Sequence, residues 1–148
     1  MDEFKLENFK KEYKKDLIFL ELSDFETKRI VNRIKNENRF NNHLPLTLSL
    51  FWKELESNSI NVESTNILEE IFNVLNLKVS SSSIVYIIWD FEKPIDVFKY
   101  DEVSKYWDDI WYDTTDEIIL LCIEDYYILI TDYGEIRYSI SQPALQNL

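Results

Sequence analysis

The first half of the chain carries apolar residues at the three- and four-residue spacing of amphipathic helices. The expected inner faces of these helices are Phe4, Leu6, Phe9 and Tyr13; Phe25, Ile30, Val31 and Ile34; Leu44, Leu48, Phe51 and Leu55; and Ile67, Leu68, Ile71, Phe72 and Leu75. "SDFE" is a capping box, so the second helix should begin after Ser23, with Glu26 three residues on. The polar stretch "NENRFNNH" predicts a loop before Pro45. Residues 1–76 are therefore predicted to form a helical layer.

From residue 77 the pattern changes to that of strands. Runs of β-branched and aromatic residues predict strands in "SSIVYIIWDF", "EIILLCI", "YYILIT" and "EIRYSI". The last three are separated by Glu124-Asp125 and by Tyr133-Gly134, which are short enough for hairpins. After the first strand, "YDEVSKYWDDIW" returns to helical spacing, with Asp101 as the expected N-cap.

The positions of the strands follow from which faces are apolar. "IVYIIW" and "IILLCI" are apolar at successive positions, so they should be central and covered on both faces. In "EIRYSI" apolar and polar residues alternate, so one face should meet water and the strand should lie near an edge. The predicted fold is α+β: an N-terminal helical layer followed by an antiparallel sheet of about four strands with one inserted helix. We expect one domain, residues 1–148, with its helical part at about 1–76 and its sheet-rich part at about 77–148.

The composition is that of a folded protein in a reducing compartment. Apolar residues make up 45% and charged residues 30% of the 148 positions, which is typical of a globular domain. The longest apolar runs are too short to span a bilayer, and the N-terminus is charged from its second residue, unlike a secretory signal. Cys122 is the one cysteine and lies inside an apolar run, so we expect a buried thiol. These features predict a cytoplasmic location and no membrane partner.

The net charge of −12 is concentrated in the last third of the chain. Residues 101–148 contain two basic and eleven acidic groups, a net charge of −9. Such a field repels nucleic acid and attracts cationic partners. The basic residues of the first helix are interpreted as a solvated face rather than a nucleic-acid site; they are Lys10, Lys11, Lys14 and Lys15. The sequence therefore predicts no nucleic-acid partner.

No catalytic pattern, cofactor motif or metal site is recognisable. His43 has no neighbouring Cys, Asp or Ser that would make it a base or a ligand, and burial would make the Cys122 thiol unreactive. One glycine cannot build a phosphate-binding loop. The carboxylates of "DDIWYDTTDE" lack the glycine that a calcium loop needs at its sharp turn. We therefore expect no catalytic residue, no cofactor and no metal ion, and hence no enzyme.

The stretch "WDDIWYDTTDE", residues 107–117, combines aromatic rings with carboxylates and contains no basic residue. One interpretation is that Trp107 and Trp111, four positions apart, attach their helix to the sheet. The other starts from the fact that Tyr106, Trp107, Trp111 and Tyr112 cannot all point to one side of a helix. Exposed rings within a rim of carboxylates are typical of a surface that binds a basic protein. The predicted partner-binding residues are Asp108, Asp109, Trp111, Tyr112, Asp113, Asp116 and Glu117.

The small size, the acidity, the lack of a catalytic constellation and the segment "WYDTTDEIILLCIEDYYILITDYG" together resemble the immunity proteins of bacterial contact-dependent inhibition and related polymorphic toxin systems. The resemblance covers the general plan of the chain and no alignable motif. It implies an inhibitor that binds a cognate, basic toxin domain, such as a nuclease, by direct protein contact. The alternative is a phage or plasmid anti-defence protein whose carboxylates mimic the phosphates of nucleic acid. Mimicry calls for regularly spaced carboxylates, whereas these are clustered and interrupted by rings, so the immunity function ranks first.

Overall fold

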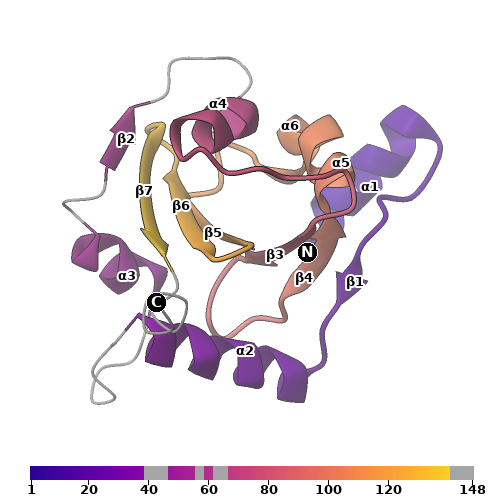
Figure 1. Cartoon of the computed structure of the whole chain (residues 1–148). Coiled ribbons are helices and arrows are strands. Elements are labelled where there is room, and N and C mark those ends of the chain that lie inside the picture. Colours follow the sequence, from indigo (N-terminus) through magenta and orange to yellow (C-terminus); the bar gives the residue numbers. More distant parts are fainter. Residues whose placement is uncertain (39–46, 56–58, 62–66, 141–148) are drawn as a thin grey trace.

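An antiparallel sheet runs through the middle of the protein. In this computed structural model, residues 1–38, 47–55, 59–61 and 67–140 are described (Figure 1). Within them, seven strands pair in the order β1-β4-β3-β5-β6-β7-β2. The strands are β1 (Leu20–Glu21), β2 (Ser59–Asn61), β3 (Ile84–Ile88), β4 (Asp96–Lys99), β5 (Ile118–Ile123), β6 (Tyr126–Thr131) and β7 (Glu135–Ile140).

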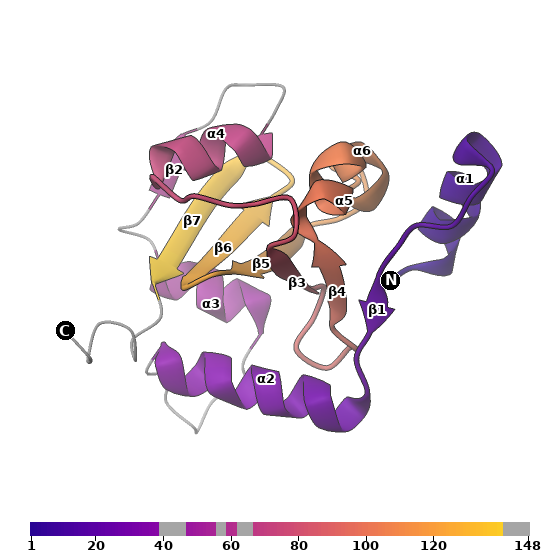
Figure 2. The ribbon, with the colours of Figure 1, turned by 45° about the vertical axis from the view of Figure 1, so that its right-hand side comes forward.

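Helices cover both faces of the sheet, as Figure 2 shows. On one face, a core around Ile71, Trp107 and Leu121 packs against α1 (Glu3–Tyr13), α4 (Ile67–Val74), α5 (Tyr100–Lys105) and α6 (Trp107–Ile110). On the other face, a second core around Ile34, Phe51 and Leu129 packs against α2 (Asp24–Glu37) and α3 (Leu48–Glu54). Since β3 and β5 have a core on each side, their runs of apolar residues are explained.

The α+β class and the antiparallel sheet are confirmed, but the sheet has seven strands in the described residues rather than about four. The unpredicted strands are β1, β2 and β4, each between two and four residues long. Segments this short contain no readable alternation, and β1 and β2 pair only with strands from the second half of the chain. The first half is therefore not one helical layer: its helices lie on both faces and it contributes both edge strands.

Two predicted core positions are wrong. Phe4 and Phe25 are exposed, whereas Lys5 and Thr27 are buried in their helices. Burial of these polar groups is possible because each is hydrogen-bonded: the Thr27 hydroxyl accepts from the backbone N–H of Ile95, and the Lys5 ammonium donates to Ile110. Ser23 is the N-cap of α2, as predicted, and accepts from the backbone N–H of Glu26. Leu44, His43 and most of the predicted polar loop lie outside the described residues.

The predicted inserted helix is two short helices, α5 and α6, which meet at Tyr106. Lys99 rather than Asp101 is the N-cap of α5, because the helix begins two residues earlier than expected. The hairpins are confirmed: Glu124 and Gly134 both have positive φ in the turns on either side of β6.

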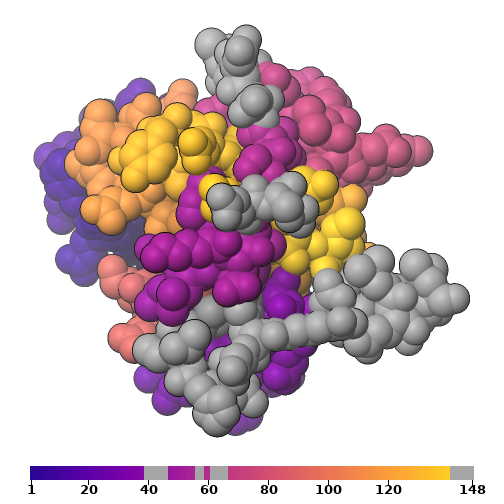
Figure 3. All heavy atoms as spheres, turned by 90° about the vertical axis from the view of Figure 1, so that its left-hand side faces the viewer, coloured from indigo at the N-terminus to yellow at the C-terminus, as the bar shows by residue number. Residues whose placement is uncertain are grey.

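Strand β7 lies next to the edge, as predicted, but of its polar face only Glu135 is exposed to water. The Arg137 guanidinium lies 4.1 Å from the ring centre of Trp52 in α3, and Ser139 is buried. Figure 3 shows α3 on this side of the surface, covering the sheet. Arg137 and Ser139 are polar because they bond to Trp52 and Asn38, not because they are solvated.

Candidate partner-binding site

Most of the aromatic rings of residues 106–112 belong to the core. Trp107 is 8% and Trp111 6% exposed, Tyr106 is also buried, and the two indoles stack with their ring centres 6.3 Å apart. Tyr112 is the ring that remains partly exposed. The tryptophans therefore attach α6 to the core of the sheet, as the first interpretation predicts, and Tyr112 reaches the surface.

A surface hollow beside α6 brings four of the predicted residues together: Asp108, Trp111, Tyr112 and Asp113. We call it the α6 hollow; its volume is about 300 Å³, and its remaining lining residues are Ile67, Trp107 and Thr114. Asp108 and Asp113 are exposed, and no described residue forms an ion pair with either. The hollow thus offers two exposed carboxylates beside the partly exposed ring of Tyr112, which is an environment suited to a guanidinium or ammonium group.

Asp109 is engaged within the protein. Its Oδ2 accepts a hydrogen bond of 2.8 Å from the Tyr13 hydroxyl, which joins α6 to α1. This hydrogen bond to a carboxylate, with a smaller effect of burial, raises the pKa of Tyr13 to about 12. Asp109 lines a second hollow with Glu12, Tyr13 and Lys105; this hollow adjoins the α6 hollow, because Asp108 lines both, but Asp109 is not among the lining residues of the α6 hollow.

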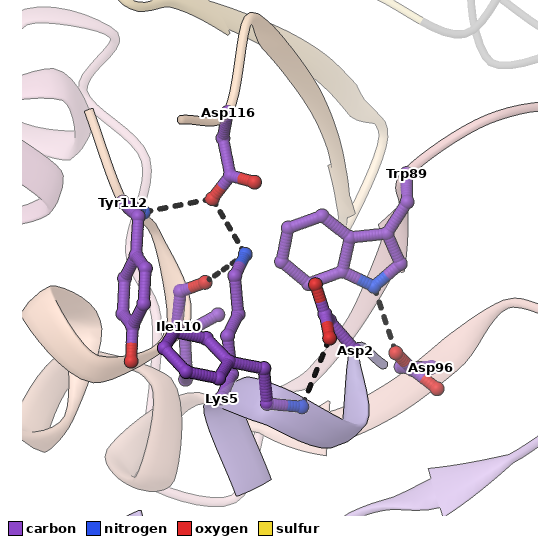
Figure 4. A network of polar contacts seen from close by, with 8 residues as sticks. Asp2, Lys5, Trp89, Asp96, Ile110, Tyr112 and Asp116 are labelled. Carbon is purple, nitrogen blue, oxygen red and sulfur yellow. Dashed lines mark hydrogen bonds and ion pairs between the residues drawn. The ribbon is translucent and has the colours of Figure 1, made fainter. Parts of the chain in front are cut away.

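Asp116 also has an internal partner. Its Oδ2 lies 2.5 Å from Nζ of Lys5 and accepts a 2.8 Å hydrogen bond from the backbone N–H of Tyr112. Lys5 is 4% exposed, and its ammonium group also donates to the carbonyl of Ile110 at 2.9 Å. The same group lies 4.2 Å from the ring centre of Trp89 (Figure 4). Asp116 therefore holds the turn between α6 and β5 onto α1.

Asp116 and Glu117 line a larger hollow, of about 620 Å³, at the end of the sheet. Met1, Lys5, Trp89 and Glu21 are among its other lining residues. Glu117 is exposed and has no ion pair among the described residues. We call this the acidic hollow, because Asp2, Glu21, Asp90, Asp116 and Glu117 outnumber Lys5 and Lys93 in it.

The sequence analysis did not identify two polar residues next to this hollow, Lys5 and Asp96. Asp96 is fully buried, pairs with the N-terminal amine at 2.9 Å, and accepts a 2.7 Å hydrogen bond from Nε1 of Trp89. The available signal for Lys5 was its place four residues before Phe9 in the apolar stripe of the first helix. No such signal marks Asp96, since its ionic partner, the N-terminal amine, is distant in sequence.

Cys122 is buried, and the described residues meet neither the requirements of a metal site nor those of a helical membrane span. Burial raises the pKa of the Cys122 thiol, as expected for an unreactive core residue. No group of three or more His, Cys, Asp or Glu side chains in the described ranges could hold a metal ion. Likewise, no helix among them has the length and apolar character needed to cross a membrane.

Comparisons of the chain with protein-family models, with curated proteins and with solved structures each found no match. A function therefore has to be inferred from the residues and their geometry.

Proposed function

We propose that this chain is a cytoplasmic immunity protein that binds a basic toxin domain and blocks it by direct contact, without catalysing a reaction. The observation that carries the proposal is the α6 hollow, in which the carboxylates of Asp108 and Asp113 stand free beside buried indoles. A protein that only needed solubility would not have to place its unpaired carboxylates around rings.

The surface ion pairs are unevenly distributed along the described residues. The surface ion pairs of the described residues all lie in the first 37 positions: Lys10 with Asp16, Glu26 with Arg29, and Arg33 with Glu37. In the last third of the chain, exposed carboxylates such as Asp108, Asp113 and Glu117 form no ion pair with any described residue. Because no described residue forms an ion pair with them, their charge is available to steer a cationic protein toward this side.

The α6 hollow can also bind the cationic side chains that the negative charge of this surface attracts. A guanidinium that enters it can bond to a carboxylate while its flat face lies on the ring face of Tyr112. Trp107 and Trp111 are fixed by stacking and core packing, so little side-chain entropy is lost when the partner binds. Steering by Asp108 and Asp113 and contact with the rings should therefore act on different rate constants.

The test is a kinetic binding experiment with the basic toxin domain encoded beside this chain's gene. Wild-type protein should bind it and protect cells that produce it. The double variant Asp108→Asn/Asp113→Asn should slow association by about tenfold at low salt and flatten its salt dependence. The matched control is Glu7→Gln/Glu54→Gln, which removes the same charge from exposed positions of α1 and α3. Equal association rates for the two double variants would contradict a steering role for the α6 hollow.

The same experiment separates the alternative function. An anti-defence protein that mimics nucleic acid would bind a nucleic-acid-binding protein and be displaced by duplex DNA or RNA. An immunity protein against a toxin that does not bind nucleic acid would be unaffected by such competitors. If the toxin is a nuclease, duplex DNA or RNA is expected to compete with this chain under either function. In that case, protection of toxin-producing cells by this chain identifies the immunity function.

A further inference from the structure

Strand β1 leaves backbone groups open at one edge of the sheet. It pairs with β4 alone, through Leu20 opposite Val97 and Glu21 opposite Asp96 (Figures 1 and 2). The direction of its backbone groups follows from the flanking hydrogen bonds. The N–H of Leu22 donates to the carbonyl of Ile95, and the N–H of Ile18 donates to Oε2 of Glu102.

In an antiparallel pair, hydrogen-bonded and non-hydrogen-bonded residue pairs alternate. Because Leu22 is hydrogen-bonded to Ile95, the backbone N–H and C=O groups of the even-numbered residues of this segment point toward β4. The N–H and C=O groups of Phe19 and Glu21 consequently point away from the sheet. No described residue bonds to them. Phe19 is held in place by stacking on Phe98, with ring centres 5.1 Å apart, so the edge is ordered before any partner arrives.

The two faces of β1 differ in character. Leu20 lines an apolar groove of about 440 Å³ with Ile18 and Ile84. Ile18 is 72% and Leu20 64% exposed, although both are apolar and lie at a sheet edge. Natural edge strands are usually protected by charge, by a bulge or by a covering element. An apolar groove beside free backbone groups is instead typical of a surface that binds another strand.

The opposite face of β1 is acidic. Glu21 lines the acidic hollow with Asp90, Asp116 and Glu117. The apolar groove extends around the edge to Phe19 and Phe98 and is also bordered by carboxylates, since Asp101 and Glu102 of α5 line it beside Lys99. A second copy of this chain, with a net charge of −12, would bring like charge to this edge. Charge complementarity therefore favours a cationic occupant.

We propose that the β1 edge binds an extended segment of the basic partner in which apolar side chains alternate with Lys or Arg. The segment adds to the sheet as a further strand and exchanges backbone hydrogen bonds with Phe19 and Glu21. Its apolar side chains occupy the groove at Ile18 and Leu20, and its cationic side chains face the acidic hollow, as the two-residue period of a strand requires. This inference rests on the proposed function only in taking the partner to be basic.

The test uses the full chain and synthetic peptides of about nine residues. One peptide alternates Val and Lys, a second has the same composition with its lysines grouped, and a third has Glu in place of Lys. The alternating peptide should bind about tenfold or more tightly than either of the others. On binding, amide hydrogen exchange should slow at Phe19 and Glu21, whereas Ile18 and Leu22 should change little because their N–H groups are already bonded.

A substitution tests the groove directly. Leu20→Lys should weaken binding of the alternating peptide by about tenfold or more, since it removes an apolar contact and adds like charge. Val74→Lys is the matched control, because Val74 is an exposed apolar residue of α4, away from this edge. Thermal unfolding should be the same for both variants, as both side chains are largely exposed.

Three results would overturn the inference. Equal binding of the alternating and grouped peptides would show attraction by charge alone. Exchange protection elsewhere than Phe19 and Glu21 would place the partner on another surface. A dimer of the wild-type chain that Leu20→Lys dissociates would identify a second copy as the occupant. If the toxin domain binds Leu20→Lys as tightly as it binds the wild-type protein, this inference fails and the proposed function stands. If the toxin domain binds neither protein, the proposed function fails, and the peptide experiments still test whether the β1 edge binds an extended segment.

Discussion

Lys5 and Asp116 form an ion pair between segments 111 positions apart, with Nζ 2.5 Å from Oδ2. It joins the first turn of α1 to the turn that leads into β5. Because the ammonium also donates to the carbonyl of Ile110, its charge is compensated although its side chain is almost fully buried. Asp116, although it belongs to the acidic stretch 107–117, therefore stabilises the fold and is not available as a free carboxylate.

Lys5→Met should lower the free energy of unfolding by about 3 kcal/mol, because it leaves the carboxylate of Asp116 without its cation in a largely buried position. The measurement is urea unfolding. Lys10→Met is the control: it removes the exposed Lys10–Asp16 pair and should leave the midpoint almost unchanged. The double variant Lys5→Met/Asp116→Asn should recover part of the loss; if it is less stable than Lys5→Met, the charge of Asp116 is not the cause.

Trp111→Ala should lower the free energy of unfolding by about 3 to 5 kcal/mol, as expected for a buried indole. Tyr133→Ala serves for comparison, because that ring is exposed in the β6–β7 turn and should contribute little. Near-native stability of Trp111→Ala would mean that the indole does not stabilise the fold and that its role is confined to partner binding. A test of its part in binding should use Trp111→Phe, which retains most of the apolar volume.

Tyr13 should ionise at unusually high pH, because its hydroxyl donates to the Asp109 carboxylate, which raises the pKa from 10.0 to about 12. A pKa raised on folding gives stabilisation that is complete below pH 10 and is lost as the pH rises through about 12. Subtracting the ultraviolet titration of Tyr13→Phe from that of wild type isolates this phenol. Asp109→Asn should return the midpoint toward 10; a midpoint near 10 in wild type would show that the hydrogen bond is absent in solution.

The Cys122 thiol should be inert in the folded protein, because burial in the core raises its pKa and excludes reagents. Reaction with an aromatic disulfide reagent at neutral pH should be slow, and it should accelerate in urea in parallel with unfolding. Since the chain has one cysteine, the signal is unambiguous. Rapid labelling without denaturant would mean that the sheet opens locally around β5.

The sequence by itself determined the elements whose side chains repeat at a regular period. Strands β5, β6 and β7 were predictable because long β-branched runs are separated by two short turns, and α2 because Ser23 caps an apolar stripe. The burial of Cys122 followed from its apolar neighbours. In each case the information lies within one local segment, where burial and hydrogen bonding impose the pattern directly.

Only the tertiary structure decided which carboxylates of the acidic stretch are free. Asp109 and Asp116 are taken by Tyr13 and Lys5 of α1, whereas Asp108 and Asp113 remain at the α6 hollow. The sequence also could not show β1, because its two residues become a strand only by pairing with β4 and leave their outer groups open. Charge and apolarity are properties of residues, but whether a charge is compensated or an edge is covered depends on segments that are distant in the chain.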